Sequence, residues 1–376
     1  MPLSAPKSPK PKYLRLFDNL SNAILSGRFK TGEKLPSEAA LVKKFGISRI
    51  TVGRALRELQ NRGLVDRVAG SGTYIRKRQG HDDEALIFGL LIPDLGETEI
   101  FEPICQGIAS ARQACGHALL WGHTDLTRDS KEEQAWQLCR QYITRKVSGV
   151  FFAPLEFEIG ADKTNQRILS ALKEANIPVV LLDRRQSGTP EQGRSDLVGI
   201  NNRQAGYLAT EHLVNLGCKR IGFLGYHGSA PTIAARMAGY REALAIHGLA
   251  AETNSVLRVE SGHEQLELLR DNPQIEAFVC VNDRVAGQLM HSFIAQHIRI
   301  PEDIRIVGID DVAYASLLPV PLTTVRQPCR AIGEAALSTM LSRIEAPKIP
   351  ARDVLLDGEL VIRESCGISL SPASII

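Results

Sequence analysis

Short apolar runs alternate with amphipathic helical stretches through most of the chain from residue 85 onward. The runs occupy 85–93, 118–123, 149–154, 178–183, 197–201, 220–226, 277–283 and 304–310. Apolar runs of this length, separated by helical patterns, are typical of parallel strands that are buried on both faces. The pattern therefore predicts an α/β fold made of βαβ units, with helices covering both faces of each parallel sheet.

Residues 12–78 follow a different pattern, mostly helical and ending in two short β-like runs around a Gly-Ser-Gly turn. Within 48–61, four apolar side chains fall on one helical face: Val52, Ala55, Leu56 and Leu59. Ser48 is suited to cap this helix, and 37–46 predicts a shorter helix just before it. Two short helices joined by a glycine-containing turn predict a helix-turn-helix, and the glycine-rich hairpin predicts a wing.

Charge is distributed unevenly between these two parts. Residues 1–80 contain 17 lysines and arginines against five aspartates and glutamates, a net charge of +12, whereas the rest of the chain carries −9. The imbalance indicates a polyanionic partner for the N-terminal part alone. A solvated basic helix in an ordinary helical domain would show similar charge, but the helix-turn-helix spacing and the wing favour DNA.

The second predicted helix and the wing contain the candidate DNA contacts. Arginine pairs with guanine edges through two hydrogen bonds and also binds phosphates, while glycines let backbone amides approach the phosphates closely. The candidates are Ser48, Arg49, Thr51, Arg54, Arg57, Arg67, Gly70, Ser71 and Gly72.

The sequence also predicts where the domains begin and end. Residues 1–11, rich in proline and lysine, predict a disordered leader, 12–78 the DNA-binding domain, 79–84 a polar linker and 85–370 the large domain. The chain has no signal-peptide pattern and no apolar stretch long enough to span a membrane, so we expect a cytoplasmic protein. Its seven cysteines are widely spaced without a C-x-x-C motif, which predicts free thiols and no metal site.

Residues 32–75, "GEKLPSEAALVKKFGISRITVGRALRELQNRGLVDRVAGSGTYI", resemble the winged helix-turn-helix of GntR-type transcriptional regulators. The resemblance implies DNA contacts by Arg49 and Thr51 from the recognition helix and by Gly70 from the wing. Two positions depart from the family, Ala39 and Gly53, where the family usually has a polar residue and an arginine. Gly53 either reflects drift, with Arg54 or Arg57 supplying the charge, or lets the helix approach the groove more closely.

The large domain carries planar polar side chains at the ends of its predicted strands. Parallel sheets bind ligands at this edge, and such side chains pair well with neighbouring hydroxyl groups. No common catalytic motif is present, so we expect neither an enzyme nor a cofactor. The candidate ligand contacts are Asp183, Arg184, Arg236, Asn282, Asp310 and Gln327, with Phe101 positioned to pack against a ring.

This domain resembles the LacI/GalR-type sensor, which is built like periplasmic sugar-binding proteins. The resemblance implies two lobes, with the chain passing between them near 199–202, 323–328 and 344–350, and gives the seven candidate residues their role in the pocket. A GntR-type DNA-binding domain joined to such a sensor is the arrangement of the arabinose-repressor group. It implies a homodimeric repressor, without a membrane partner, that binds a palindromic double-stranded operator and responds to a small sugar.

Three other interpretations remain open at the level of sequence. The same regulator could sense a purine or another metabolite, although the hydroxyl-matching side chains favour a sugar. The chain could instead be a sugar-binding protein without a DNA role, which the basic N-terminal part and the missing export signal disfavour. An aminotransferase-like enzyme fused to such a DNA-binding domain would need a cofactor lysine in a longer chain.

Overall fold

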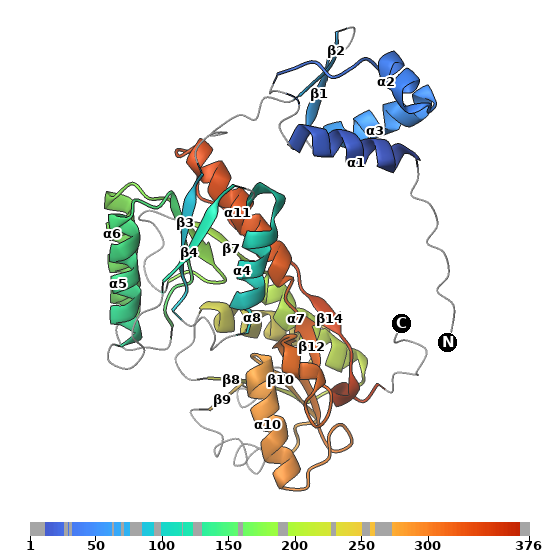
Figure 1. The fold of residues 1–376 in the computed structure, drawn as a ribbon. Helices are drawn as coiled ribbons and strands as arrows, with labels where there is room; N and C mark the ends of the chain where they lie inside the picture. Colours follow the sequence, from blue (N-terminus) through green and yellow to red (C-terminus); the bar gives the residue numbers. More distant parts are fainter. Residues whose placement is uncertain are drawn as a thin grey trace, which may run out of the picture. The chain divides into compact units, whose positions relative to one another are not determined.

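A computed structural model shows how these patterns fold (Figure 1). The structure describes residues 12–25, 29, 32–61, 64–68, 71–75, 85–93, 99–114, 116–122, 130–156, 161–186, 195–226, 231–249, 256–259 and 273–368. The chain divides into two compact units, Met1–Glu84 and Ala85–Ile376.

The first unit is a small helical domain with a two-stranded wing. It contains α1 (Lys12–Leu25), α2 (Glu38–Phe45), α3 (Arg49–Asn61), β1 (Val65–Val68) and β2 (Gly72–Ile75), the two strands pairing antiparallel. The four apolar positions of the predicted helix are all buried and pack with residues of α1, α2 and the wing. Figure 1 shows α1 lying alongside α3.

Local hydrogen bonds explain where these helices begin and end. Ser37 Oγ accepts the Ala40 amide at 3.2 Å and caps α2. Gly46 ends the same helix in the left-handed conformation, with φ of 61°, and donates its N–H to the Val42 carbonyl. Ser48 Oγ then accepts the Thr51 amide at 3.3 Å, so α3 starts two residues after the turn.

The second unit has two lobes, each built on a six-stranded sheet. The first-lobe sheet is entirely parallel, in the order β13-β7-β6-β5-β3-β4. Its strands are β3 (Ile87–Leu91), β4 (Ala118–Trp121), β5 (Gly149–Phe152), β6 (Val179–Leu182), β7 (Asp196–Ile200) and β13 (Asp353–Leu356). Helices α5 (Lys131–Thr144) and α6 (Ala161–Glu174) cover one face, while α4 (Phe101–Ser110) and α11 (Cys329–Glu345) cover the other (Figure 1).

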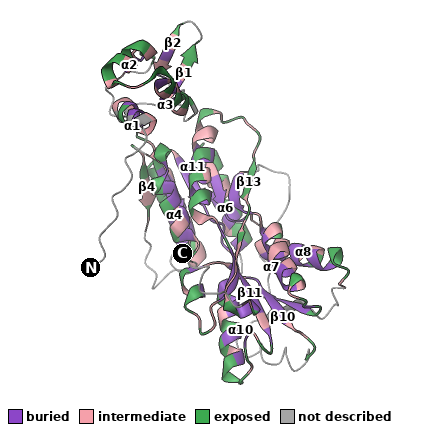
Figure 2. Cartoon of the chain, turned by 90° about the vertical axis from the view of Figure 1, so that its right-hand side faces the viewer, coloured by how far each residue is buried: buried purple, intermediate pink, exposed green. Residues whose placement is uncertain are grey.

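The second-lobe sheet has the order β14-β12-β11-β10-β8-β9, and only β14 runs antiparallel. Its strands are β8 (Ile221–Tyr226), β9 (Val256–Val259), β10 (Ala277–Cys280), β11 (Arg305–Asp310), β12 (Thr323–Arg326) and β14 (Glu359–Val361). Helices α7 (Asn202–Asn215) and α8 (Pro231–Ile246) pack together on this lobe, which also contains α10 (Asp283–Ala295). The central strands β8, β10 and β11 are almost wholly buried, whereas the edge strand β14 is partly exposed (Figure 2). The prediction of parallel sheets covered by helices is confirmed.

The chain passes between the lobes three times. It leaves β7 for α7 at residues 200–202, returns from β12 to α11 at 326–329, and crosses again from β13 to β14 at 356–359. The predicted third passage, at 344–350, is therefore wrong. The loop after α11 leads instead into β13, which pairs with β7 in the first-lobe sheet, because Asp353–Leu356 extends that sheet before the chain crosses.

Candidate ligand cleft and nucleic-acid interface

A cavity of about 90 Å³ opens between the carboxyl ends of the strands of the two lobes. Five of the seven predicted ligand residues line it: Asp183, Arg184, Arg236, Asn282 and Asp310. Asp183 follows β6 of the first lobe, whereas Asn282 and Asp310 lie at the ends of β10 and β11 of the second. The cleft therefore brings together polar groups from both lobes.

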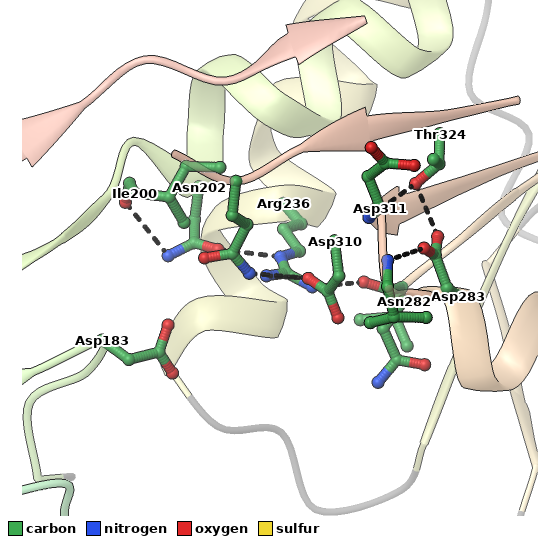
Figure 3. Close-up of polar contacts among 12 residues, drawn as sticks. Asp183, Ile200, Asn202, Arg236, Asn282, Asp283, Asp310, Asp311 and Thr324 are labelled. Carbon is green, nitrogen blue, oxygen red and sulfur yellow. Dashed lines mark hydrogen bonds and ion pairs between the residues drawn. The ribbon is translucent and has the colours of Figure 1, made fainter. Parts of the chain in front are cut away.

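The backbone turns sharply where two of these carboxylates leave their strands. Asp183 has φ of 65° and Asp310 has φ of 133°, values that residues with a side chain rarely adopt. Figure 3 shows Asp183 on one side of the cleft and Asp310 on the other. Such strained conformations cluster at ligand sites, where the surrounding structure holds them in place.

The Arg236 side chain, from α8, makes hydrogen bonds to α7, to the residue after β10 and to the end of β11 (Figure 3). Its Nε donates to Asn202 Oδ1 at 2.8 Å, one Nη donates to the Val281 carbonyl, and the other donates to Asp310 Oδ1 at 3.2 Å. The residue is only 6% exposed. Because these bonds fix the guanidinium and Asp310 together, the carboxylate has a defined orientation before any ligand arrives.

Gln327 contributes from behind the cleft rather than from its wall. Its Nε2 donates to Asp310 Oδ1 at 2.6 Å, and its Oε1 is buried without a hydrogen-bond partner among the described residues. The side chain instead borders a larger cavity of about 640 Å³, beside α4 and the end of β12. Gln327 thus orients Asp310 in this conformation.

Arg184 and Asp183 form the first-lobe wall. Arg184 Nε donates to the Pro154 carbonyl at 2.9 Å, and Nη1 contacts Asp183 Oδ2 at 2.9 Å and Glu156 Oε1 at 3.1 Å. Phe101 is fully buried and does not line the cavity; its ring centroid lies 5.6 Å from Arg184 Cζ. Phe101, the first residue of α4, therefore packs against the Arg184 guanidinium and not against the ligand surface.

Burial changes the proton affinity of the second-lobe carboxyls. Burial raises the pKa of Asp310 to about 6, against the opposing influence of Arg236 and Gln327. Burial, helped by the nearby Asp310, raises the pKa of Asp283 to about 7. Asp283 accepts hydrogen bonds from Thr324 Oγ1 at 2.5 Å and from the Val312 amide at 3.0 Å, so it braces the loop after β11.

Asn282 combines a structural role with an available donor. Its Oδ1 accepts the Val285 amide at 2.9 Å and caps α10. Its Nδ2 makes no hydrogen bond to another described residue, and the side chain lies at the cavity wall. The cap fixes the side chain and leaves the amide N–H groups to a ligand.

Sequence reasoning missed several residues at the cavity wall. They are Glu99, Ile100, Glu156, Thr232, Ile233, Arg284, Val312 and Tyr314. Most lie in loops or in the first turn of a helix, away from the polar ends of apolar strands that guided the prediction. Arg284 follows Asn282 by two residues, so a search of the first helical turn after each strand would have found it.

The candidate DNA surface lies at the start of α3 and on the wing. Arg49 is exposed, and its Nε contacts Glu38 Oε2 at 3.4 Å. Glu38 Oε1 also accepts from Arg67 of β1 at 2.6 Å. One carboxylate of α2 thus links an arginine of the recognition helix to an arginine of the wing. Ser48 and Thr51 share a hydrogen bond of 2.8 Å at the start of the helix.

The side chains of the remaining candidates differ in what they contact. The Arg54 guanidinium stacks 3.9 Å from the centroid of the Tyr13 ring, so this side chain packs toward α1. Arg57 is exposed and its Nε donates back to the Gly53 carbonyl at 3.4 Å. Ser71 and Gly72 form the turn of the wing, where Ser71 Oγ contacts Tyr74 Oη at 2.6 Å. Gly70 lies outside the described residues.

Two features are absent from the residues that the structure describes. Within them, no cluster of three or more histidine, cysteine or acidic side chains is arranged to hold a metal ion. No helix in the described ranges has the length and apolar character needed to cross a bilayer.

Comparison with known proteins matches each unit to a different family. Residues 12–75 match the family described as "Bacterial regulatory proteins, gntR family", and residues 210–366 match "Periplasmic binding protein-like domain". Both expected resemblances are therefore confirmed, the first over the helix-turn-helix and wing, the second over most of the second lobe together with α11 and β13 of the first.

Individual relatives match the chain over different shares of its length. The chain is 29% identical to the "Arabinose metabolism transcriptional repressor" of Geobacillus stearothermophilus, over 94% of this chain and 97% of the relative. It is 30% identical to the "HTH-type transcriptional repressor PurR" of Photobacterium profundum, over 54% of this chain and 61% of that protein. Among solved structures, the transcription regulator GntR from Chromobacterium violaceum is 28% identical, with a TM-score of 0.58 over 75% of this chain and 99% of that one.

Proposed function

We propose that this chain, a transcriptional regulator with a GntR-family DNA-binding domain and a periplasmic-binding-protein-like domain, is a repressor that a small sugar controls. Each first unit binds half of a palindromic operator, and the cleft of the second unit holds the sugar. The chain acts as a homodimer in the cytoplasm, since one helix-turn-helix reads one half-site and dimer geometry sets the half-site spacing. The role requires neither catalysis nor a cofactor.

The observation that carries the sugar assignment is which polar atoms of the cleft remain available. The cavity wall carries four carboxylates against three guanidinium groups, and two of the three are already paired, Arg184 with two carboxylates and Arg236 with Asp310. An anionic ligand would therefore meet an excess of negative charge. Asp183 Oδ1, Asp310 Oδ2 and Asn282 Nδ2 make no hydrogen bond to other described residues. Hydroxyl groups donate to carboxylates and accept from amides at once, so a neutral polyol satisfies all three.

The size of the cavity agrees with a small ligand. At the roughly 30 Å³ that one water occupies in the liquid, a cavity of about 90 Å³ holds about three water molecules. A cavity of this size favours the smallest sugars over disaccharides and longer chains. Pentoses, with L-arabinose first because of the named relative, are therefore the ligands to test before larger sugars.

Ligand binding can be measured by thermal unfolding of the full chain in the presence of single sugars. A sugar present at 100 times its Kd should stabilise the folded protein by about 2.7 kcal/mol. Arg236→Ala should abolish this shift while operator binding remains, because Arg236 orients Asp310 and lies in the unit that does not touch DNA. The matched control is Arg299→Ala, an exposed arginine of the same lobe, which should respond like the wild type.

A mutant Arg236→Ala that still responds at the wild-type sugar concentration would contradict the pocket assignment. A relative named PurR keeps a second effector class open. If nucleobases or nucleosides shift the unfolding temperature and pentoses do not, the cleft senses a metabolite other than a sugar.

A further inference from the structure

The recognition helix exposes an apolar side chain that its own domain does not use. Ile50, the second residue of α3, is 82% exposed, the highest value among the exposed large hydrophobic residues that the structure describes. The core face of the same helix is fully covered, with Val52, Ala55 and Leu59 each at 0% exposure. Isoleucine has no polar group for water or phosphate, so its exposure next to Arg49 calls for an apolar partner.

Helical geometry sets the direction of this side chain. At 100° per residue, Ile50 lies opposite the centre of the buried stripe, and Arg57 follows it on the same outward face. Arg49 and Arg54 lie on opposite sides of Ile50. Arg49 turns toward Glu38 of α2, and Arg54 stacks on Tyr13 of α1. The outward face of α3 therefore carries Ile50, Arg54 and Arg57, with Gly53 about 60° round from Ile50 on the side of Arg49.

Gly53 is not explained by packing within the domain. A β-carbon built on it would meet nothing within 4 Å, and its φ lies in the ordinary helical range. Glycine in a helix interior is less stable than alanine, so the domain alone would favour alanine here. The missing side chain leaves a shallow step between Ile50 and Arg57, along which the helix backbone can approach a partner closely.

We propose that Ile50 contacts the methyl group of a thymine in the major groove of the operator, and that Gly53 provides the close approach this contact needs. The inference rests on the proposed function, because it names what the same DNA-binding surface reads. The thymine methyl is the apolar group that a standard base pair presents in the major groove, and apolar side chains read it there. Ile50 is thus a specificity-determining residue that recognises thymine without a hydrogen bond.

The test starts from operators selected from random duplexes by the full-length protein. Each thymine of the selected half-site is then replaced in turn by deoxyuridine, which removes the methyl group and leaves base pairing unchanged. At one position, this replacement should weaken wild-type binding about fourfold for each half-site, the factor expected for losing one buried methyl group. Ile50→Ala should bind the thymine and deoxyuridine operators equally well. Leu317→Ala, equally exposed but in the other unit, should keep the wild-type preference.

A second variant tests the role of the glycine. Gly53→Ala should raise the melting temperature of the protein, since alanine favours the helix, yet weaken binding to the selected operator. Wild-type affinity that is unchanged by deoxyuridine at every thymine would overturn the inference while leaving DNA binding intact. A Gly53→Ala protein that binds the operator as tightly as the wild type would contradict the close approach. If the wild-type protein selected no duplex at all, the proposed function itself would fail.

Discussion

At the scale of single residues, the second lobe depends on a carboxyl group held away from water. Asp283 is fully buried, and it bridges the loop after β11 to the side chain of Thr324 in β12. Because burial raises its pKa to about 7, the folded protein favours the neutral form far more than the unfolded chain does. The pKa of Asp310 is also raised by burial, to about 6, so this carboxyl favours the neutral form in the folded protein too.

This arrangement makes stability fall as the pH rises. Because the folded protein binds this proton more tightly than the unfolded chain does, protonation of Asp283 stabilises the fold. This stabilisation is fully present below the ordinary aspartate pKa and is lost as the pH rises through about 7. At about 1.4 kcal/mol for each pKa unit, the loss from Asp283 is at most about 4 kcal/mol. Denaturant unfolding of the full chain between pH 5 and 8 should therefore show declining stability.

Asp283→Asn should flatten this decline, because the variant cannot ionise and keeps one side-chain oxygen as an acceptor. Asp303→Asn serves as the control, since the pKa of Asp303 is lowered to about 2 by its hydrogen bonds to Arg299 and lies outside the range studied. A wild-type protein whose stability increases from pH 5 to 8, or an Asp283→Asn slope equal to the wild type, would show that this buried carboxyl stays ionised.

At the scale of elements, the contact between α1 and α3 gives Arg54 a role that its sequence position does not reveal. Its guanidinium covers the ring of Tyr13 at 3.9 Å, a stacked geometry in which the cation and the aromatic face attract. Arg49, at the other flank, makes a long contact with Glu38 and stays exposed. Both side chains are exposed, and the stacking contact gives Arg54 a role in holding α1 against α3.

Substitution should separate this packing role from a contact with DNA. Arg54→Ala should lower the stability of the first unit by about 0.5–1 kcal/mol, with a smaller loss of operator affinity than Arg49→Ala causes. Tyr13→Leu should reproduce the stability loss without removing a charge. Arg49→Ala should leave the melting temperature nearly unchanged, because exposed ion pairs contribute little to stability. If Arg54→Ala abolished operator binding at wild-type stability, Arg54 would be a DNA contact after all.

The elements also show which features sequence patterns can predict. The eight apolar runs predict eight of the eleven parallel strands in the described part of the chain and miss β9, β12 and β13. The four-residue apolar stripe predicts α3, because this periodicity follows directly from burial. Polar residues at strand ends were brought together since parallel strands end at one edge. The direction of Arg54, the depth of Phe101 and the third passage between lobes were not predictable, because each depends on a neighbouring element far away in the sequence.

At the scale of the whole molecule, the proposed ligand cleft and the proposed DNA surface lie in different units and must be coupled for a sugar to control operator binding. Three chain segments join the lobes of the second unit, so a ligand that bridges Asp183 and Asp310 can change the angle between the lobes. A ligand changes operator affinity only if it binds the two lobe arrangements with different affinity. Coupling between sites of this kind is typically about five- to 150-fold in affinity.

Coupling between the cleft and the DNA-binding unit can be measured by titrating the selected operator with the full-length protein, with and without a saturating sugar that stabilises it. We expect at least about fivefold weaker operator binding with the sugar present, and no change for Arg236→Ala. Identical wild-type affinities with and without the bound sugar would contradict the claim that the cleft controls the DNA-binding unit.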